Sequence, residues 1–149
     1  MTHQTFRVGV VVARRPSPSR WTQHSWRVAA IVPEVPSLGA GEVLGKEGAE
    51  TMIYAGTGEV EFHRVETANY RDNLVAGRPS LWVTLEPVDD EPGIRLVAVT
   101  ADPAEGESMT EAGELLVEVA PMPPEMAEAL AAFVREHHVE RVFTKRKRE

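Results

Sequence analysis

The sequence predicts a single α+β domain in which an antiparallel β-meander is covered by one long C-terminal helix. Short runs of β-branched residues follow one another closely, and such strands pair antiparallel because a parallel pair needs a crossover of about a dozen residues. The 149 residues fit one domain, and the longest stretch with helical periodicity comes last. We expect the sheet to curl into a partly closed barrel, with an exposed edge through which two copies could pair as a homodimer.

The first two strands are predicted from valine-rich runs that end at prolines. Residues 6–13 and 26–32 are rich in β-branched side chains. A Pro/Ser-rich segment follows the first run and Pro33 follows the second, and proline cannot donate to a sheet ladder. From residue 33 to 49 the composition changes to proline, glycine and small residues, which predicts a long irregular loop.

A β-hairpin is predicted at the centre of the chain. Met52–Ala55 and Val60–His63 flank Gly56-Thr57-Gly58, and glycine tolerates the positive φ of a tight turn. In the second arm, apolar and acidic residues alternate, which is typical of a half-buried strand. Its outward side would carry Glu59 and Glu61.

Two short helices and three more strands are predicted next. Thr67 is a candidate cap for a helix that stops at Gly77. Asp102-Pro103 is a cap followed by a first-turn proline, and it predicts a helix that ends near Gly113. The strands are expected at residues 81–85, 94–99 and 115–119.

The terminal helix is predicted from Pro124 to His138, because its apolar residues recur at helical spacing while its charged residues lie elsewhere on the helix. We interpret the apolar stripe as core. Trp26 and Trp82 lie within strands and are expected to anchor that core as well. The stripe consists of Met126, Leu130, Phe133, Val134 and His137.

Composition excludes several classes of function. The chain has no cysteine, which rules out disulfides, thiolate zinc sites, iron–sulfur ligation and a thiol nucleophile. No apolar stretch approaches the roughly 20 residues of a membrane span, and the first residues lack a signal-peptide pattern. The net charge is −7 and the pI about 5.3, so the folded surface should repel nucleic acid. We therefore expect a cytoplasmic protein that binds neither nucleic acid nor membrane.

The C-terminal end differs in charge from the rest. Lys145, Arg146, Lys147 and Arg148 are consecutive, and without the last six residues the chain carries 12 bases and 22 acids, a net charge of −10. Four adjacent like charges favour an extended, solvated chain. The sequence thus predicts a domain over residues 1–143 and a basic disordered tail over 144–149. The tail is either a solubilising end or an electrostatic hook for an acidic partner.

A second candidate for partner binding follows the first strand. Arg14, Arg15, Arg20 and Trp21 would combine guanidinium donors with an aromatic face. The alternative interpretation is that these arginines are simply solvated.

No catalytic, cofactor-binding or metal-binding residue is predicted. Gly39-Ala40-Gly41 lacks the preceding strand and following helix of a phosphate loop, and no serine lies in a Gly-x-Ser-x-Gly context. His137 and His138 are adjacent on a helix and cannot bind one ion from the same face. Acidic groups such as Glu59 with Glu61 could bind a hard cation, but alternating acids are more typical of a solvent-facing surface.

Three parts of the chain together resemble a family of uncharacterised proteobacterial proteins described only as a domain of unknown function. They are Val11–Ser17 with Arg20-Trp21 and Trp26-Arg27; Glu66–Leu74 with Gly77-Arg78-Pro79; and Pro121–Pro124 with Phe133-Val134, His137–Val139 and Lys145–Arg148.

Members of that family are encoded beside formate dehydrogenase and its maturation factors. The resemblance therefore implies an accessory role in assembling this molybdoenzyme, with a dehydrogenase subunit or a maturation factor as partner. Some members are labelled as molybdopterin-guanine dinucleotide synthesis proteins. Such nucleotidyltransferases open with a Leu-Ala-Gly-Gly type loop, which the segment Val8–Pro16 does not contain.

Three functions follow from the sequence as alternatives. The leading hypothesis is a non-enzymatic accessory or adaptor protein. The second is a module that binds a small ligand or cofactor, with residues 33–49 as a lid. The third is an enzyme whose catalytic groups converge from distant positions.

Overall fold

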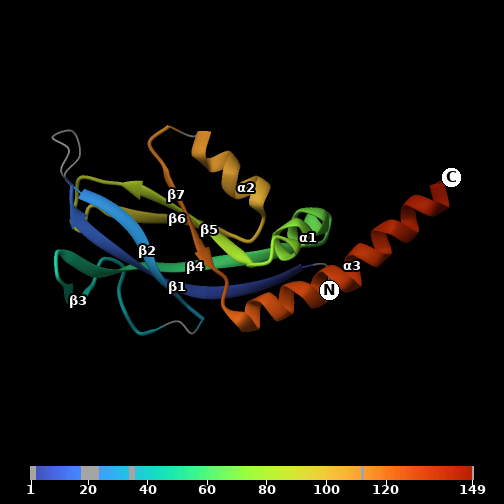
Figure 1. The fold of residues 1–149 in the computed structure, drawn as a ribbon, viewed down its shortest axis with the longest axis horizontal. Helices are drawn as coiled ribbons and strands as arrows, with labels where there is room; N and C mark the ends of the chain where they lie inside the picture. The colour runs from blue at the N-terminus through green and yellow to red at the C-terminus, as the bar shows by residue number, and fades with distance from the viewer. Residues whose placement is uncertain (1–2, 18–23, 34–35, 112, 149) are drawn as a thin grey trace.

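The computed structural model of the chain describes residues 3–17, 24–33, 36–111 and 113–148, with side chains from Gln4 to His137 within these ranges. It contains strands in two antiparallel sheets, together with three helices and two short 3₁₀ turns. Figure 1 shows the two sheets facing each other, with the helices gathered toward one end.

The first sheet is built around the long strand β1. It has the order β2-β1-β4-β3, and every neighbouring pair is antiparallel. Alternate residues of β1, namely Val8, Val10 and Val12, are fully buried, which explains why a valine-rich run forms its centre. The strands predicted near residues 6–13 and 26–32 are thus confirmed. The members are β1 (His3–Pro16), β2 (His24–Val32), β3 (Val43–Glu47) and β4 (Glu50–His63).

The second sheet has the order β6-β5-β7, again antiparallel throughout. Strand β4 packs against β6, and β2 against β7, but within the described residues no ladder joins the sheets. The sheet therefore does not close into the expected barrel; it is two sheets that face each other across a core. The members are β5 (Ser80–Pro87), β6 (Ile94–Thr100) and β7 (Leu116–Pro121).

The predicted hairpin at residues 52–63 is wrong, because β4 runs straight through both arms. Gly56, with φ of 143°, lies at a bulge: Val10 pairs with Gly56, but Val11 already pairs with Tyr54. Gly58 is needed for space, since a Cβ there would lie 2.6 Å from Cγ2 of Val99 on β6. The two glycines serve a bulge and a close approach, and neither forms a turn.

The actual hairpin in this region connects β3 to β4. Part of the predicted irregular loop, Val43–Glu47, forms β3 and turns back through Gly48 and Ala49. Gly48 has φ of 59°, which suits the first central position of a two-residue turn. Val43 and Leu44 remain exposed along this edge strand.

Helix α1 (Thr67–Val75) follows the 3₁₀ turn η1 (Arg64–Glu66), and α2 (Pro103–Ser108) precedes the turn η2 (Met109–Glu111). Gly77 adopts φ of 92° just after α1, as predicted. Thr67 is not the cap of α1, because Glu66 holds that position and Thr67 is buried inside the first turn.

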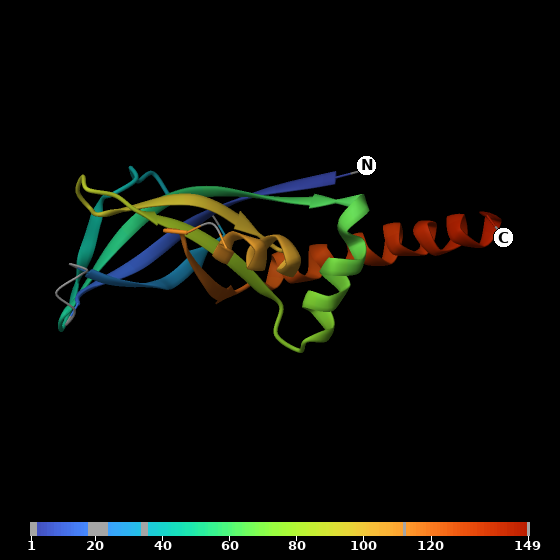
Figure 2. The same cartoon turned by 90° about the horizontal axis from the view of Figure 1, so that it is seen from above.

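The cap of α2 is Asp102, as predicted. Its carboxylate accepts hydrogen bonds from the backbone N–H groups of Ala104 (2.9 Å) and Glu105 (3.3 Å). Figure 2 shows α1 and α2 from above, with α3 running past them.

Helix α3 (Pro124–Arg148) packs against α1 and η1. Its predicted stripe, from Met126 to His137, is buried as expected. The ring of Phe133 lies 5.7 Å from that of Phe62 and 6.2 Å from that of Tyr70. The backbone remains helical to Arg148 and so includes the basic segment that was expected to be extended. The division of the chain at residue 143 stays a prediction.

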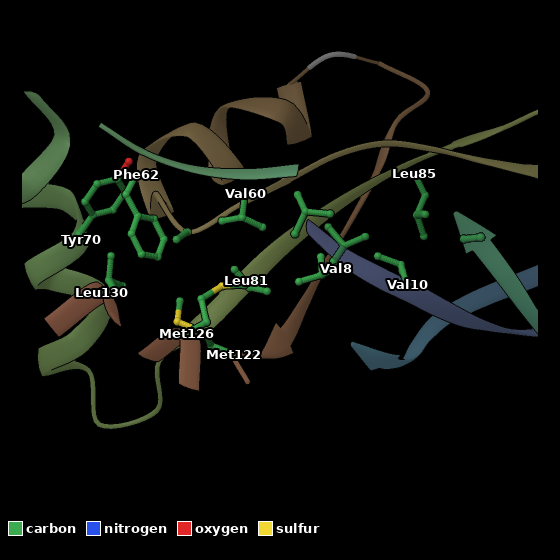
Figure 3. Packing of buried hydrophobic residues seen from close by; sticks show 14 of the residues in the cluster. Val8, Val10, Val60, Phe62, Tyr70, Leu81, Leu85, Met122, Met126 and Leu130 are labelled. Carbon is green, nitrogen blue, oxygen red and sulfur yellow. The ribbon is translucent and has the colours of Figure 1, made fainter. Parts of the chain in front are cut away.

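The core lies between the sheets and continues beneath α3. Figure 3 shows Met122 and Met126 beside Leu81, and Leu130 beside the rings of Tyr70 and Phe62.

The two strand tryptophans lie outside the centre of this core and are partly exposed. Trp26 packs against the core from its margin. Trp82 lies against α2, where a Cβ on Gly106 would be only 2.3 Å from its Cγ.

Candidate functional site

The predicted arginine and tryptophan edge is described only in part. Nη1 of Arg14 donates to Oε2 of Glu91 (3.2 Å) and to the carbonyl of Pro92 (2.9 Å). Arg14 therefore joins β1 to the connection between β5 and β6, whereas Arg15 is exposed. Arg20 and Trp21 lie outside the described residues, as do the side chains of Lys145–Arg148. Partner binding by these eight residues stays a prediction.

The structure shows a different feature, an acidic recess of about 200 Å³ between β4, α1, β6 and α2. Strand alternation creates one wall: Val60 and Phe62 point into the core, so Glu59, Glu61 and His63 point out of it. Residues 98–100 of β6 and the residues at the beginnings of α1 and α2 form the other walls. The five carboxylates of the acidic recess belong to Glu59, Glu61, Glu66, Asp102 and Glu105.

Tyr70 lies at the inner side of the acidic recess and is almost completely buried. Its hydroxyl accepts a hydrogen bond from the backbone N–H of His63 (2.9 Å) and donates to the carbonyl of Glu61 (3.2 Å). Burial, together with the nearby negative charge of Asp102, raises the pKa of Tyr70 to about 12. Tyr70 is therefore protonated at neutral pH and holds the end of β4 against α1.

Glu66 and Asp102 carry two neighbouring carboxyl groups that share one hydrogen-bond donor. Nδ2 of Asn69 donates to Oε2 of Glu66 (3.1 Å) and to Oδ2 of Asp102 (3.2 Å). The amide of Asn69 thus bridges the two carboxyl groups. Burial raises the pKa of Glu66, and so do hydrogen bonding with the neighbouring Asp102 carboxyl group and its charge, whereas the hydrogen bond from Asn69 lowers it.

Comparison with known proteins gives one result. The model of a family described as a protein of unknown function, DUF3305, matches residues 7–147. The chain belongs to the DUF3305 family. No curated protein and no solved structure matches the chain. The resemblance to a domain of unknown function is thus confirmed, while the family description names no activity and no link to formate dehydrogenase.

The acidic recess of this DUF3305 protein is suited to the recognition of positively charged groups. It presents several carboxylates within a small volume. Its lining contains two further titratable side chains, those of His63 and Tyr70. Nε2 of His63 lies 3.0 Å from Oε2 of Glu61. Within the described residues, no group of three or more His, Cys, Asp or Glu side chains could hold a metal ion.

Another hollow in the described part of the DUF3305 chain carries less chemistry. A hollow of about 340 Å³ lies between Gln4 and one face of α3, where it is lined by Ala129, Ala132 and Phe133 with Glu136 and His137. No helix in the described part of the chain has the length and apolarity needed to cross a bilayer.

Sequence reasoning found only parts of the acidic recess. The sequence indicates Glu59 and Glu61 as a pair of outward-facing acids and Asp102 as a helix cap. Glu66 and Glu105 were missed, although each lies in the first turn of a predicted helix or just before it. The capping pattern at Asp102 was the available signal for α2, but no local pattern indicates that both helices begin beside β4.

Proposed function

We propose that this DUF3305 protein is a non-enzymatic accessory protein that binds a basic segment of a partner protein in its acidic recess. The observation that carries the proposal is the convergence of five carboxylates from three parts of the chain on one small recess. A lysine or arginine side chain supplies the matching charge and several hydrogen-bond donors. The net charge of −7 would also attract such a partner over a longer range.

The size and lining of the acidic recess favour a side chain over a cofactor. Its volume of about 200 Å³ is smaller than that of ordinary ligand pockets, which measure roughly 300–1,000 Å³ and are mostly apolar. Tyr70 is held protonated and bonded to the backbone, so it is unsuited to act as a base at neutral pH. These properties support a binding role rather than a catalytic one.

The proposed partner class comes from the family resemblance. The resemblance implies a link to formate dehydrogenase, so the partner would be a dehydrogenase subunit or one of its maturation factors. The basic segment Lys145–Arg148 would act as a second contact, toward an acidic surface of the same partner. Both contacts would weaken as salt increases.

Binding of a fluorescent hexa-arginine peptide tests the acidic recess. The variant Glu59→Gln/Glu61→Gln removes two of its carboxylates, and Glu125→Gln/Glu128→Gln removes two exposed carboxylates on α3 as a control of equal charge. We expect a larger loss of affinity for the first variant, at low and at physiological salt. Equal losses would show attraction by overall charge and would contradict the proposal.

The partner class is tested separately, by co-purification of the full chain with formate dehydrogenase and its maturation factors. We expect a stable complex that the Glu59→Gln/Glu61→Gln variant weakens. If the peptide binds at the acidic recess but no complex forms, the recess assignment holds and the partner assignment is wrong.

A further inference from the structure

The contact between Glu66 and Asp102 joins two helices at their first residues. Glu66 is the cap residue of α1, and Asp102 is the cap residue of α2. Asp102 is 5% exposed, and its Oδ1 already accepts two backbone hydrogen bonds from α2. Its other oxygen accepts from Asn69, so all three hydrogen bonds to this carboxylate suit its ionised form. Any proton shared by the pair therefore resides on Glu66.

The surroundings of the pair add negative charge on several sides. Glu105 faces it from α2, and Glu59 and Glu61 line the same recess from β4. His63 contacts Glu61, and Tyr70 on α1 is the remaining titratable group in the lining. Ionisation of Glu66 places a further negative charge directly against Asp102, which is unfavourable in a partly buried setting.

We propose that the Glu66–Asp102 contact is a one-proton latch between α1 and α2, closed while Glu66 holds a proton and opened when both carboxyl groups are ionised. In the closed form, the Glu66 O–H donates to Asp102, and Asn69 bridges both groups. In the open form, the two carboxylates repel each other, and the beginnings of α1 and α2 separate. The latch is a property of the fold and does not require that the acidic recess bind a partner.

The direction of the pH effect follows from proton linkage. The pKa of Glu66 is raised in the folded protein, so between its ordinary value and its raised value the folded state binds more protons than the unfolded state. The stabilisation is complete below the ordinary glutamate pKa and is lost as pH rises through the raised one. The latch therefore opens as solution becomes less acidic.

The test compares the urea midpoints of the wild type, Glu66→Gln and the control Glu128→Gln across pH 4 to 8, a range that begins below the ordinary glutamate pKa. A glutamine at position 66 donates an N–H to Asp102 without carrying charge, so this variant should keep its low-pH midpoint across the range. The control replaces an exposed glutamate on α3, so it should behave like the wild type. Both proteins should lose stability as pH rises. A parallel fall in Glu66→Gln would overturn the latch.

A second measurement follows the ionisation of Glu66 and the opening of α2 directly. Carbon-13 NMR of the glutamate side chains should show Glu66 titrating at higher pH than the exposed glutamates. Amide hydrogen exchange, corrected for its intrinsic pH dependence, should increase in α2 over the same interval and not in β1. Titration of Glu66 together with the exposed glutamates would contradict the proposal.

Discussion

Replacement of Gly58 by alanine tests how β4 passes beneath β6. The new Cβ would lie 2.6 Å from Cγ2 of Val99 and 3.4 Å from its Cβ. Val99 is β-branched and 4% exposed, so it has little freedom to move aside. Gly58 is not among the glycines with positive φ, and the cost is therefore steric. Overpacking of this kind should destabilise the protein by about 1–3 kcal/mol.

A double-mutant cycle separates this clash from a general effect of the substitution. Val99→Ala alone should cost about 2 kcal/mol through lost burial and a small cavity. Because it removes the clashing methyl group, the pair Gly58→Ala/Val99→Ala should be more stable than the sum of the single variants by about 1–2 kcal/mol. Urea denaturation measures all three free energies of unfolding.

Gly39→Ala is the control for this cycle, since its Cβ would meet only Oε2 of Glu42 at 4.0 Å. It should change stability by no more than about 0.5 kcal/mol. Two results would refute the continuous strand and would favour a turn at this position. One is that the losses of unfolding free energy in the two single variants simply add in the double variant; the other is that Gly58→Ala is as stable as Gly39→Ala.

Three further substitutions probe the packing around the helices. Phe133→Ala removes a buried ring from the stripe of α3 and should lower the free energy of unfolding by about 3–5 kcal/mol in chemical denaturation. Gly106→Ala places a Cβ against Trp82 and should both destabilise the protein and shift its tryptophan fluorescence. Tyr70→Phe takes the acceptor from the His63 N–H and should cost about 1–3 kcal/mol, measured by thermal unfolding.

Elements with a strong local pattern could be predicted from the sequence. A valine-rich run predicts β1 and the apolar spacing predicts the buried face of α3, because burial decides both patterns. A β-branched run predicts β2, although none of its residues is fully buried. The glycines of β4 could not be interpreted in the same way. Glycine permits a turn, a bulge or a close approach equally well, and the choice at Gly58 depends on Val99, which is distant in the sequence.

The separation into two sheets has a similar origin. Short connections correctly predicted antiparallel neighbours within each sheet. Whether β4 and β6 share a ladder depends instead on the side chains between them, and Leu96 and Val99 pack against the glycines of β4. Arg14 adds a further tie between the sheets through the carbonyl of Pro92. None of these contacts has a local sequence signature.

The acidic recess depends on one buried side chain that carries no charge. Nδ2 of Asn73 donates to the carbonyls of Ser80 and Ala101, both at 2.9 Å, and its Oδ1 accepts from the Ser80 N–H at the same distance. These bonds tie α1 to the start of β5 and to the residue immediately before Asp102. In the sequence, Asn73 is an ordinary polar residue of a short helix. In the fold, Asn73 helps to place the cap of α2 beside the cap of α1. Acidic residues that the sequence suggests are simply solvated therefore line a concave recess.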